Sequence, residues 1–122
     1  MSFYFVTTIA SIAGAVLGIG WIFAGTLLFK RWGMKAHPDG LLVGRRIGAV
    51  YLGIAIMLFL GRAAPPSDLR SALCFGLMLS MLMLATLGVV EYKARRANAV
   101  ILVSTALEIF LAAGFASVLL AT

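Results

Sequence analysis

The chain has little charge and few of the side chains from which soluble catalytic sites are built. Of its 122 residues only 11% are charged, four are acidic, one is histidine and one is cysteine. A soluble domain usually has about a quarter of its residues charged. The lone cysteine, Cys74, excludes an internal disulfide, and no pair of His or Cys residues has metal-ligand spacing. We therefore expect no metal and no cofactor.

The sequence motifs of common enzyme classes are also missing. There is no Walker loop, dinucleotide fingerprint, nucleophile elbow, zinc signature or Cys-x-x-Cys. Cys74 lies in an apolar stretch, where a small buried hydrophobe is expected. His37 lies in a polar loop, where we expect it to be solvated. Because every stretch between the apolar segments is short, a soluble-type active site has no room, and an enzyme is disfavoured.

Apolar residues are abundant instead. They make up 63% of the chain, and the mean hydropathy is +1.11. One small soluble core could not hide that much apolar surface, whereas the hydrocarbon of a bilayer accommodates it. The length allows a single domain, residues 1–122. The sequence therefore predicts an integral membrane protein with the lipid bilayer as its first partner.

Four apolar segments approach or exceed the ~20 residues that a membrane-spanning helix needs. They predict an all-α polytopic membrane protein whose four transmembrane helices form an antiparallel bundle. The first segment has no basic residue before it and is far longer than the roughly 7–15 residue core of a signal peptide, so we expect it to be retained. The predicted helices cover about 3–29, 42–62, 68–91 and 98–121.

The second of these segments is the shortest. Its charge-free part, 47–61, would span about 22 Å at ~1.5 Å per residue, less than the ~30 Å hydrocarbon core. The helix is therefore expected to begin near Leu41 and to continue through Arg45 and Arg46, which would lie at the membrane edge. The His-Pro-Asp-Gly run at 37–40 is expected to be a turn, because Pro fixes φ and Gly tolerates positive φ.

Glycines recur every four residues on the first two segments. Gly14 and Gly18 share one face of the first segment, and Gly44 and Gly48 share one face of the second. This spacing allows close contact between helices in a membrane. We expect these four residues at helix-packing faces.

The net charge of +6 is concentrated between the apolar segments. Eight of the ten Lys and Arg residues lie at the first and third connections, and two, Arg62 and Arg70, at the second. The positive-inside rule then makes loops 30–46 and 91–98 cytoplasmic and both termini periplasmic in a bacterial inner membrane. No basic patch is interleaved with exposed aromatics, so no nucleic acid partner is expected.

Glu108 is the only charged residue of the fourth segment and lies near its middle. A charged side chain there costs several kcal/mol on insertion scales, so it should face other helices. Ser104 and Thr105 share its face, and Tyr51 and Ser80 are candidate partners on other segments. Two interpretations stay open: a proton- or ligand-binding carboxylate in a membrane pocket, or a protonated Glu that locks helix packing through hydroxyl groups.

Glu91 lies at the cytoplasmic end of the third segment. We expect it to form an ion pair with Arg45 or Arg46 at this rim, and the alternative is a carboxylate solvated beside Lys93. In a third and weaker hypothesis, the protein is an enzyme that acts on a lipid or quinone at this rim. Its site would consist of Arg45, Arg46, Glu91 and Tyr92.

The run RRIGAVYLGIA at residues 45–55, followed by RSAL at residues 70–73, resembles the DoxX-like small four-helix integral membrane proteins. The resemblance covers the second and third segments, about half of the chain. It implies a four-helix membrane fold and assigns no particular activity.

Two functions follow as hypotheses. In the first, the protein binds or transports a small lipophilic or protonatable ligand through an intramembrane site around Glu108, since apolar walls with a few polar groups characterise such pockets. In the second, it is a non-catalytic membrane subunit or assembly protein whose glycine faces mediate self-association or a membrane complex. A cavity at Glu108 favours the first, and a filled core with an open glycine face favours the second.

Overall fold

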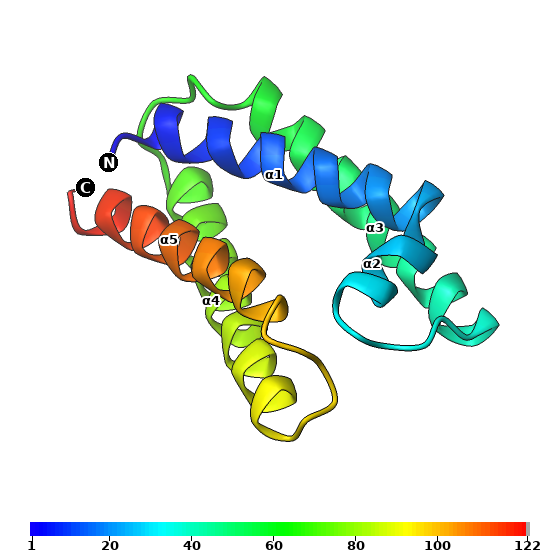
Figure 1. Cartoon of the computed structure of the whole chain (residues 1–122). Coiled ribbons are helices and arrows are strands. Elements are labelled where there is room, and N and C mark those ends of the chain that lie inside the picture. The colour runs from blue at the N-terminus through cyan, green and yellow to red at the C-terminus, as the bar shows by residue number, and fades with distance from the viewer. Residues whose placement is uncertain (122) are drawn as a thin grey trace. The chain divides into compact units, whose positions relative to one another are not determined.

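The computed structural model describes residues 1–121, which form five helices and no strand (Figure 1). Four of the helices, α1, α3, α4 and α5, are long and apolar enough to cross a membrane. The prediction of an all-α membrane protein with four spanning helices is therefore confirmed. The helices are α1 (Phe3–Phe23), α2 (Gly25–Arg31), α3 (Pro38–Leu60), α4 (Asp68–Lys93) and α5 (Ile101–Leu120).

The chain divides into two compact units. Unit 1 contains Met1–Val6 and the chain from Arg62 onward, with α4 and α5. Unit 2 is Thr7–Gly61, which holds most of α1 and all of α2 and α3. The single membrane domain expected over 1–122 stays a prediction, and each unit is described by itself.

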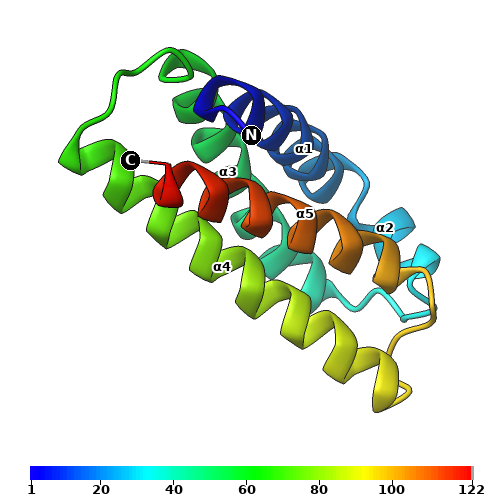
Figure 2. The ribbon, with the colours of Figure 1, turned by 90° about the vertical axis from the view of Figure 1, so that its left-hand side faces the viewer.

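In unit 2, α1 and α3 lie against each other through their backbones. A Cβ atom added to Gly18 would stand 2.8 Å from the carbonyl oxygen of Gly48, and one added to Gly48 would stand 2.7 Å from that of Gly18. Four residues earlier in α1, Gly14 meets Ala55, which lies later in α3. The two helices therefore run antiparallel, as both ribbon views show (Figures 1 and 2).

The first apolar segment is not one helix over 3–29, as the sequence predicted. It breaks at Ala24 (φ −134°, ψ 33°), and α2 begins one residue later. Gly20 and Gly25 flank the break, and glycine lowers the free-energy cost of leaving the helix. Gly25 also lies close to α3, because a Cβ atom there would lie 3.0 Å from Cδ2 of Leu41.

The end of α2 reverses the chain in a Schellman motif. Gly33 has φ 74°, and its N–H donates to the carbonyl of Lys30 at 3.0 Å. The N–H of Met34 donates to the carbonyl of Phe29 at 2.9 Å. This pattern satisfies the last carbonyls of a helix and requires the left-handed conformation that glycine adopts most easily. The motif fixes the position of Trp32, the residue before the glycine.

The helix α3 begins at Pro38, earlier than the sequence predicted, because the residues expected to form a turn are its first helical turn. Proline is well suited to the first helical position, where its missing N–H has no intrahelical acceptor. Asp39 in the same turn is favoured by the positive end of the helix dipole. The 23 residues of α3 extend about 34 Å at ~1.5 Å each, enough to span, and they run past Arg45 and Arg46 as predicted.

In unit 1, α4 and α5 form an antiparallel pair joined by a short connection (Figure 2). The hydroxyl of Ser67 caps α4 by accepting a hydrogen bond from the N–H of Arg70 at 3.1 Å. The helix ends at Lys93, two residues beyond the predicted end. Gly88 of α4 lies directly against the hydroxyl of Thr105 in α5, so a Cβ atom there would have to displace that hydroxyl.

The start of α5 is shifted from the predicted residue 98 to Ile101. The side chain of Asn98 accepts a hydrogen bond from the N–H of Val100 at 3.1 Å, which holds these residues in a turn. At the other end of α5, the N-terminus of the chain packs on the helix. The Met1 ammonium donates to Oγ of Ser117 at 3.1 Å, and Gly114 admits the side chain of Val6.

Candidate functional site

Glu108 lies in the middle of α5 with only one of its carboxylate oxygens hydrogen-bonded. The hydroxyl of Ser104, one turn earlier, donates to Oε1 at 2.9 Å. The other oxygen, Oε2, is buried and has no hydrogen-bond partner among residues 1–121. Buried polar atoms nearly always have a partner, so an orphaned oxygen needs an explanation. Protonation of Oε2 would remove the charge on this buried oxygen, and a polar ligand atom would give it a hydrogen-bond partner.

The other hydroxyls predicted around Glu108 bond elsewhere. Thr105 is buried and donates to the carbonyl of Ile101 at 3.3 Å. Ser80 in α4 donates to the carbonyl of Gly76 in its own helix at 2.9 Å, the back-bonding usual for serine inside a helix. Of the three predicted hydroxyls in the described part of unit 1, the structure therefore hydrogen-bonds only that of Ser104 to Glu108.

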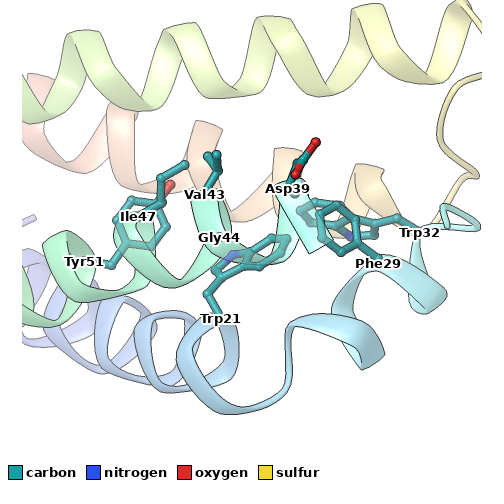
Figure 3. A pocket seen from close by; sticks show the side chains of 9 residues that line it. Trp21, Phe29, Trp32, Asp39, Val43, Gly44, Ile47 and Tyr51 are labelled. Carbon is teal, nitrogen blue, oxygen red and sulfur yellow. The ribbon is translucent and has the colours of Figure 1, made fainter. Parts of the chain in front are cut away.

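The remaining predicted residue, Tyr51, lines a pocket in unit 2 (Figure 3). The pocket has a volume of about 440 Å³, within the range of small-ligand sites. Its walls come from three segments of the chain: α1, α2 with the residue that follows it, and one face of α3. The lining residues are Trp21, Phe29, Trp32, Asp39, Gly40, Val43, Gly44, Ile47 and Tyr51.

Three of the aromatic rings form one cluster. The rings of Trp21 and Phe29 meet edge to face, with centroids 5.1 Å apart and an interplanar angle of 75°. Trp21 and Trp32 meet in the same way at 5.7 Å and 64°. This geometry is the one that aromatic quadrupoles prefer. Trp21 is the central member, so the break before α2 and the turn at Gly33 both serve to bring rings to it.

Gly44 positions Trp21 against α3. A Cβ atom at Gly44 would lie 2.7 Å from Cε3 of the indole, so any larger residue would displace the ring. The sequence predicted Gly44 at a contact between helices, and the structure places a side chain rather than a backbone on it. The glycine therefore shapes the wall of the pocket.

The charge on the pocket wall is negative. Asp39, in the first turn of α3, is the only charged lining residue. Arg45 and Arg46, predicted for the cytoplasmic rim, are exposed and do not line the pocket. The wall thus combines four aromatic side chains and small or aliphatic residues with one carboxylate.

Sequence reasoning did not find this site. Its α3 wall repeats at helical spacing through residues 40, 44, 47 and 51, a signal that was available. The remaining walls depend on Trp21 and Phe29, which cannot be brought together in a continuous helix 3–29 as they are after the break at Ala24. Asp39 was missed because its run was expected to be a turn.

Glu91 pairs with Arg96 of its own unit, and the ion pair expected with Arg45 or Arg46 of unit 2 stays a prediction. The contact is bidentate, with Nε of Arg96 2.6 Å from Oε2 and Nη2 3.0 Å from Oε1. The carboxylate of Glu91 raises the pKa of the Arg96 guanidinium above its ordinary value, first through the hydrogen bond and then through its charge. Arg96 therefore remains charged.

The backbone explains this choice of partner. Arg95 adopts φ 60°, and the N–H of Arg96 donates to the carbonyl of Glu91 at 3.0 Å, which closes a second Schellman motif. The turn brings the Arg96 side chain back along the last turn of α4. No glycine marks this turn in the sequence, so the pairing could not be foreseen.

No protein-family model matches the chain, and neither a curated protein nor a solved structure is significantly similar to it. The site therefore has to be interpreted from its own chemistry.

Proposed function

We propose that this membrane protein binds a small lipophilic ligand and that the pocket of unit 2 holds it. The observation that carries the proposal is the pocket itself, about 440 Å³ of space walled by four aromatic side chains and one carboxylate. Predominantly apolar walls with few polar groups are typical of small-molecule sites. Trp21 and its ring partners would supply apolar contact area, and Asp39 would orient the ligand.

The distribution of basic residues supports an orientation for the site. In a bacterial inner membrane with both termini periplasmic, the loop 30–46 is cytoplasmic. Asp39 and the start of α3 would then open the pocket toward the cytoplasmic surface, while Tyr51 would lie deeper. Kinship with the DoxX-like proteins, suggested by residues 45–55 and 70–73, is part of the proposal for the fold only.

Glu108 supplies the protonatable group of the proposal. Its orphaned Oε2 supports a role in binding a proton, which would allow ligand movement to be coupled to a proton gradient. Ser104 would keep the carboxyl group oriented in both protonation states, because its hydroxyl already bonds the other oxygen.

A role as a non-catalytic assembly subunit draws less support. The four glycines predicted for self-association are occupied within unit 2, where Gly14, Gly18 and Gly48 contact the facing helix and Gly44 contacts Trp21; Gly53 and Gly76, where an added Cβ atom would meet no atom within 4 Å, are what support this role. A small-residue face that is already covered cannot also receive a second chain.

The proposal can be tested with a neutral apolar dye, N-phenyl-1-naphthylamine, on the full chain in nonionic micelles. The chain has two tryptophans, Trp21 and Trp32, and both line the pocket, so energy transfer from tryptophan to dye reports on this site. We expect saturable transfer. Val43→Phe, which fills the pocket from α3, should weaken dye binding about tenfold, equivalent to about 1.4 kcal/mol.

Val50→Phe is the matched control for this experiment. Val50 is on the same helix and similarly exposed, but it does not line the pocket, so the dye should bind as it does to the unaltered chain. Transfer that rises linearly without saturation, or an equal effect of the two substitutions, would show only partition into the micelle and would refute the proposal.

A further inference from the structure

We infer that the pocket of unit 2 selects a lipophilic organic cation, such as an ammonium or phosphonium ion carrying apolar groups. The inference rests on the proposed function, because it names the class of ligand for the same pocket. Two independent properties of the wall lead to it, the sign of its charge and the chemistry of its rings.

The charge that an occupant would meet is negative. Asp39 is the only charged residue among the nine that line the pocket. It lies in the first turn of α3. An anion would be repelled by this group, and a neutral ligand would gain nothing from its charge.

The rings add attraction of the same sign. The faces of aromatic rings carry negative charge density, so they attract cations, most strongly in the case of Trp. The lining rings of Trp21, Phe29, Trp32 and Tyr51 come from three segments of the chain. Figure 3 shows Trp21, Phe29 and Trp32 together near the start of α3 and Tyr51 further along the same helix. Recognition of quaternary ammonium ions by such sets of rings follows the same physics.

The basic residues of the same segment do not reverse the preference of the pocket for a cation. The segment that carries Asp39 also holds five basic residues, but all of them are exposed and none lines the pocket: Lys30, Arg31, Lys35, Arg45 and Arg46. Solvent and salt screen charges that do not contact the occupant more strongly than they screen a contact. The residues that contact the ligand, rather than these exposed basic residues, therefore determine which ligand charge the pocket prefers.

The decisive experiment compares two ions of equal shape and opposite charge. Tetraphenylphosphonium and tetraphenylborate would each be titrated onto the full chain in uncharged maltoside micelles, with the fluorescence of Trp21 and Trp32 as the signal. We expect saturable quenching by the phosphonium ion and at least about tenfold weaker binding of the borate, since each factor of ten corresponds to about 1.4 kcal/mol.

Asp39→Asn keeps the shape of the side chain and removes its charge. It should weaken phosphonium binding about twofold to fivefold, the size expected for an ion pair with an exposed carboxylate, and reduce the difference in affinity between the phosphonium and the borate. Asp68→Asn is the matched control, because Asp68 is also the acid in the first turn of a spanning helix but belongs to α4 and lines no part of this pocket. It should leave both affinities unchanged.

Several results would overturn the inference. Equal or tighter binding of the borate would show that the surrounding basic residues prevail, and an unchanged preference in Asp39→Asn would show that the carboxylate is not the counter-charge. Displacement of the phosphonium ion by a short-chain phosphatidylcholine at equal concentration would assign the site to a lipid headgroup instead of a free cation. If neither ion binds while the neutral dye does, only this inference fails; if the dye also fails, the proposed function falls with it.

Discussion

The two units hold their helices together by different means. In unit 2, glycines bring the backbones of α1 and α3 into contact, and Gly18 and Gly48 each stand against the other's carbonyl oxygen. In unit 1, the closest approach between α4 and α5 places Gly88 against the side chain of Thr105 instead. A carbonyl oxygen in a helix cannot move without bending the helix, whereas a threonine side chain has a rotatable bond.

This difference has a consequence for function. Close backbone contact between Gly18 and Gly48 holds α1 along α3 until α1 breaks at Ala24. Between the contact and the break, Trp21 packs on Gly44 and forms part of the pocket wall. In unit 1, α5 carries a carboxylate with one orphaned oxygen at Glu108. Unit 2 therefore offers a pocket with a shaped wall, and unit 1 offers a carboxyl group with one unsatisfied oxygen. Three groups of substitutions test this contrast.

The largest effect is expected where backbones touch. Gly48→Ala puts a methyl group 2.7 Å from the carbonyl oxygen of Gly18 and 2.9 Å from Cβ of Trp21, neither of which can yield freely. Overpacking of this kind costs about 1–3 kcal/mol, and we expect the upper half of that range. The free energy of unfolding, measured by the loss of helical circular dichroism with added denaturing detergent, should fall accordingly. Binding of the apolar dye should weaken too, because Trp21 is displaced.

Gly53→Ala provides the control on the same helix. A Cβ atom at Gly53 meets no atom within 4 Å, so the only change is the higher helix propensity of alanine, worth about 0.5–1 kcal/mol in favour of folding. Equal losses in the two variants would mean that glycine matters for helix flexibility rather than for contact, and the contrast between the units would lose its basis.

An intermediate effect, of opposite sign, is expected at Glu108. Glu108→Leu removes a buried carboxyl group whose only hydrogen bond comes from its own helix, so the free energy of unfolding should rise by about 1–2 kcal/mol. Glu108→Gln keeps the bond from Ser104 but cannot titrate, and any dependence of ligand binding on pH that the carboxyl group causes should vanish. A loss of stability in Glu108→Leu would instead mean that the carboxyl group locks helix packing.

The sequence alone was sufficient to predict the features that depend on hydrophobicity averaged over many residues. Four apolar segments predict four spanning helices because the bilayer imposes a minimum length on each one. The sequence was insufficient where one backbone angle redirects a side chain. Ala24 breaks a segment that is apolar on both sides, and Arg95 takes a left-handed conformation that its side chain disfavours. The aromatic cluster and the partner of Glu91 both depend on such positions, so neither could be deduced from periodicity or charge.

The smallest effect is expected from exchanging the residues that end α2 and α4. Both helices end in Schellman motifs, but unit 2 uses Gly33 at φ 74° and unit 1 uses Arg95 at φ 60°. A side chain in the left-handed region costs about 1–2 kcal/mol, less the entropy that glycine loses on folding. Arg95→Gly should therefore stabilise the chain by about 0.5–1 kcal/mol. Gly33→Ala should destabilise it by a similar amount and also weaken dye binding, since Trp32 precedes the turn.

The same detergent titration measures the change in the free energy of unfolding for both variants. Ala94→Gly, at the preceding right-handed position, is the control. Should Arg95→Gly destabilise the chain as Ala94→Gly does, the conformation at Arg95 is not strained and the ion pair between Glu91 and Arg96 becomes the main reason that α4 ends where it does.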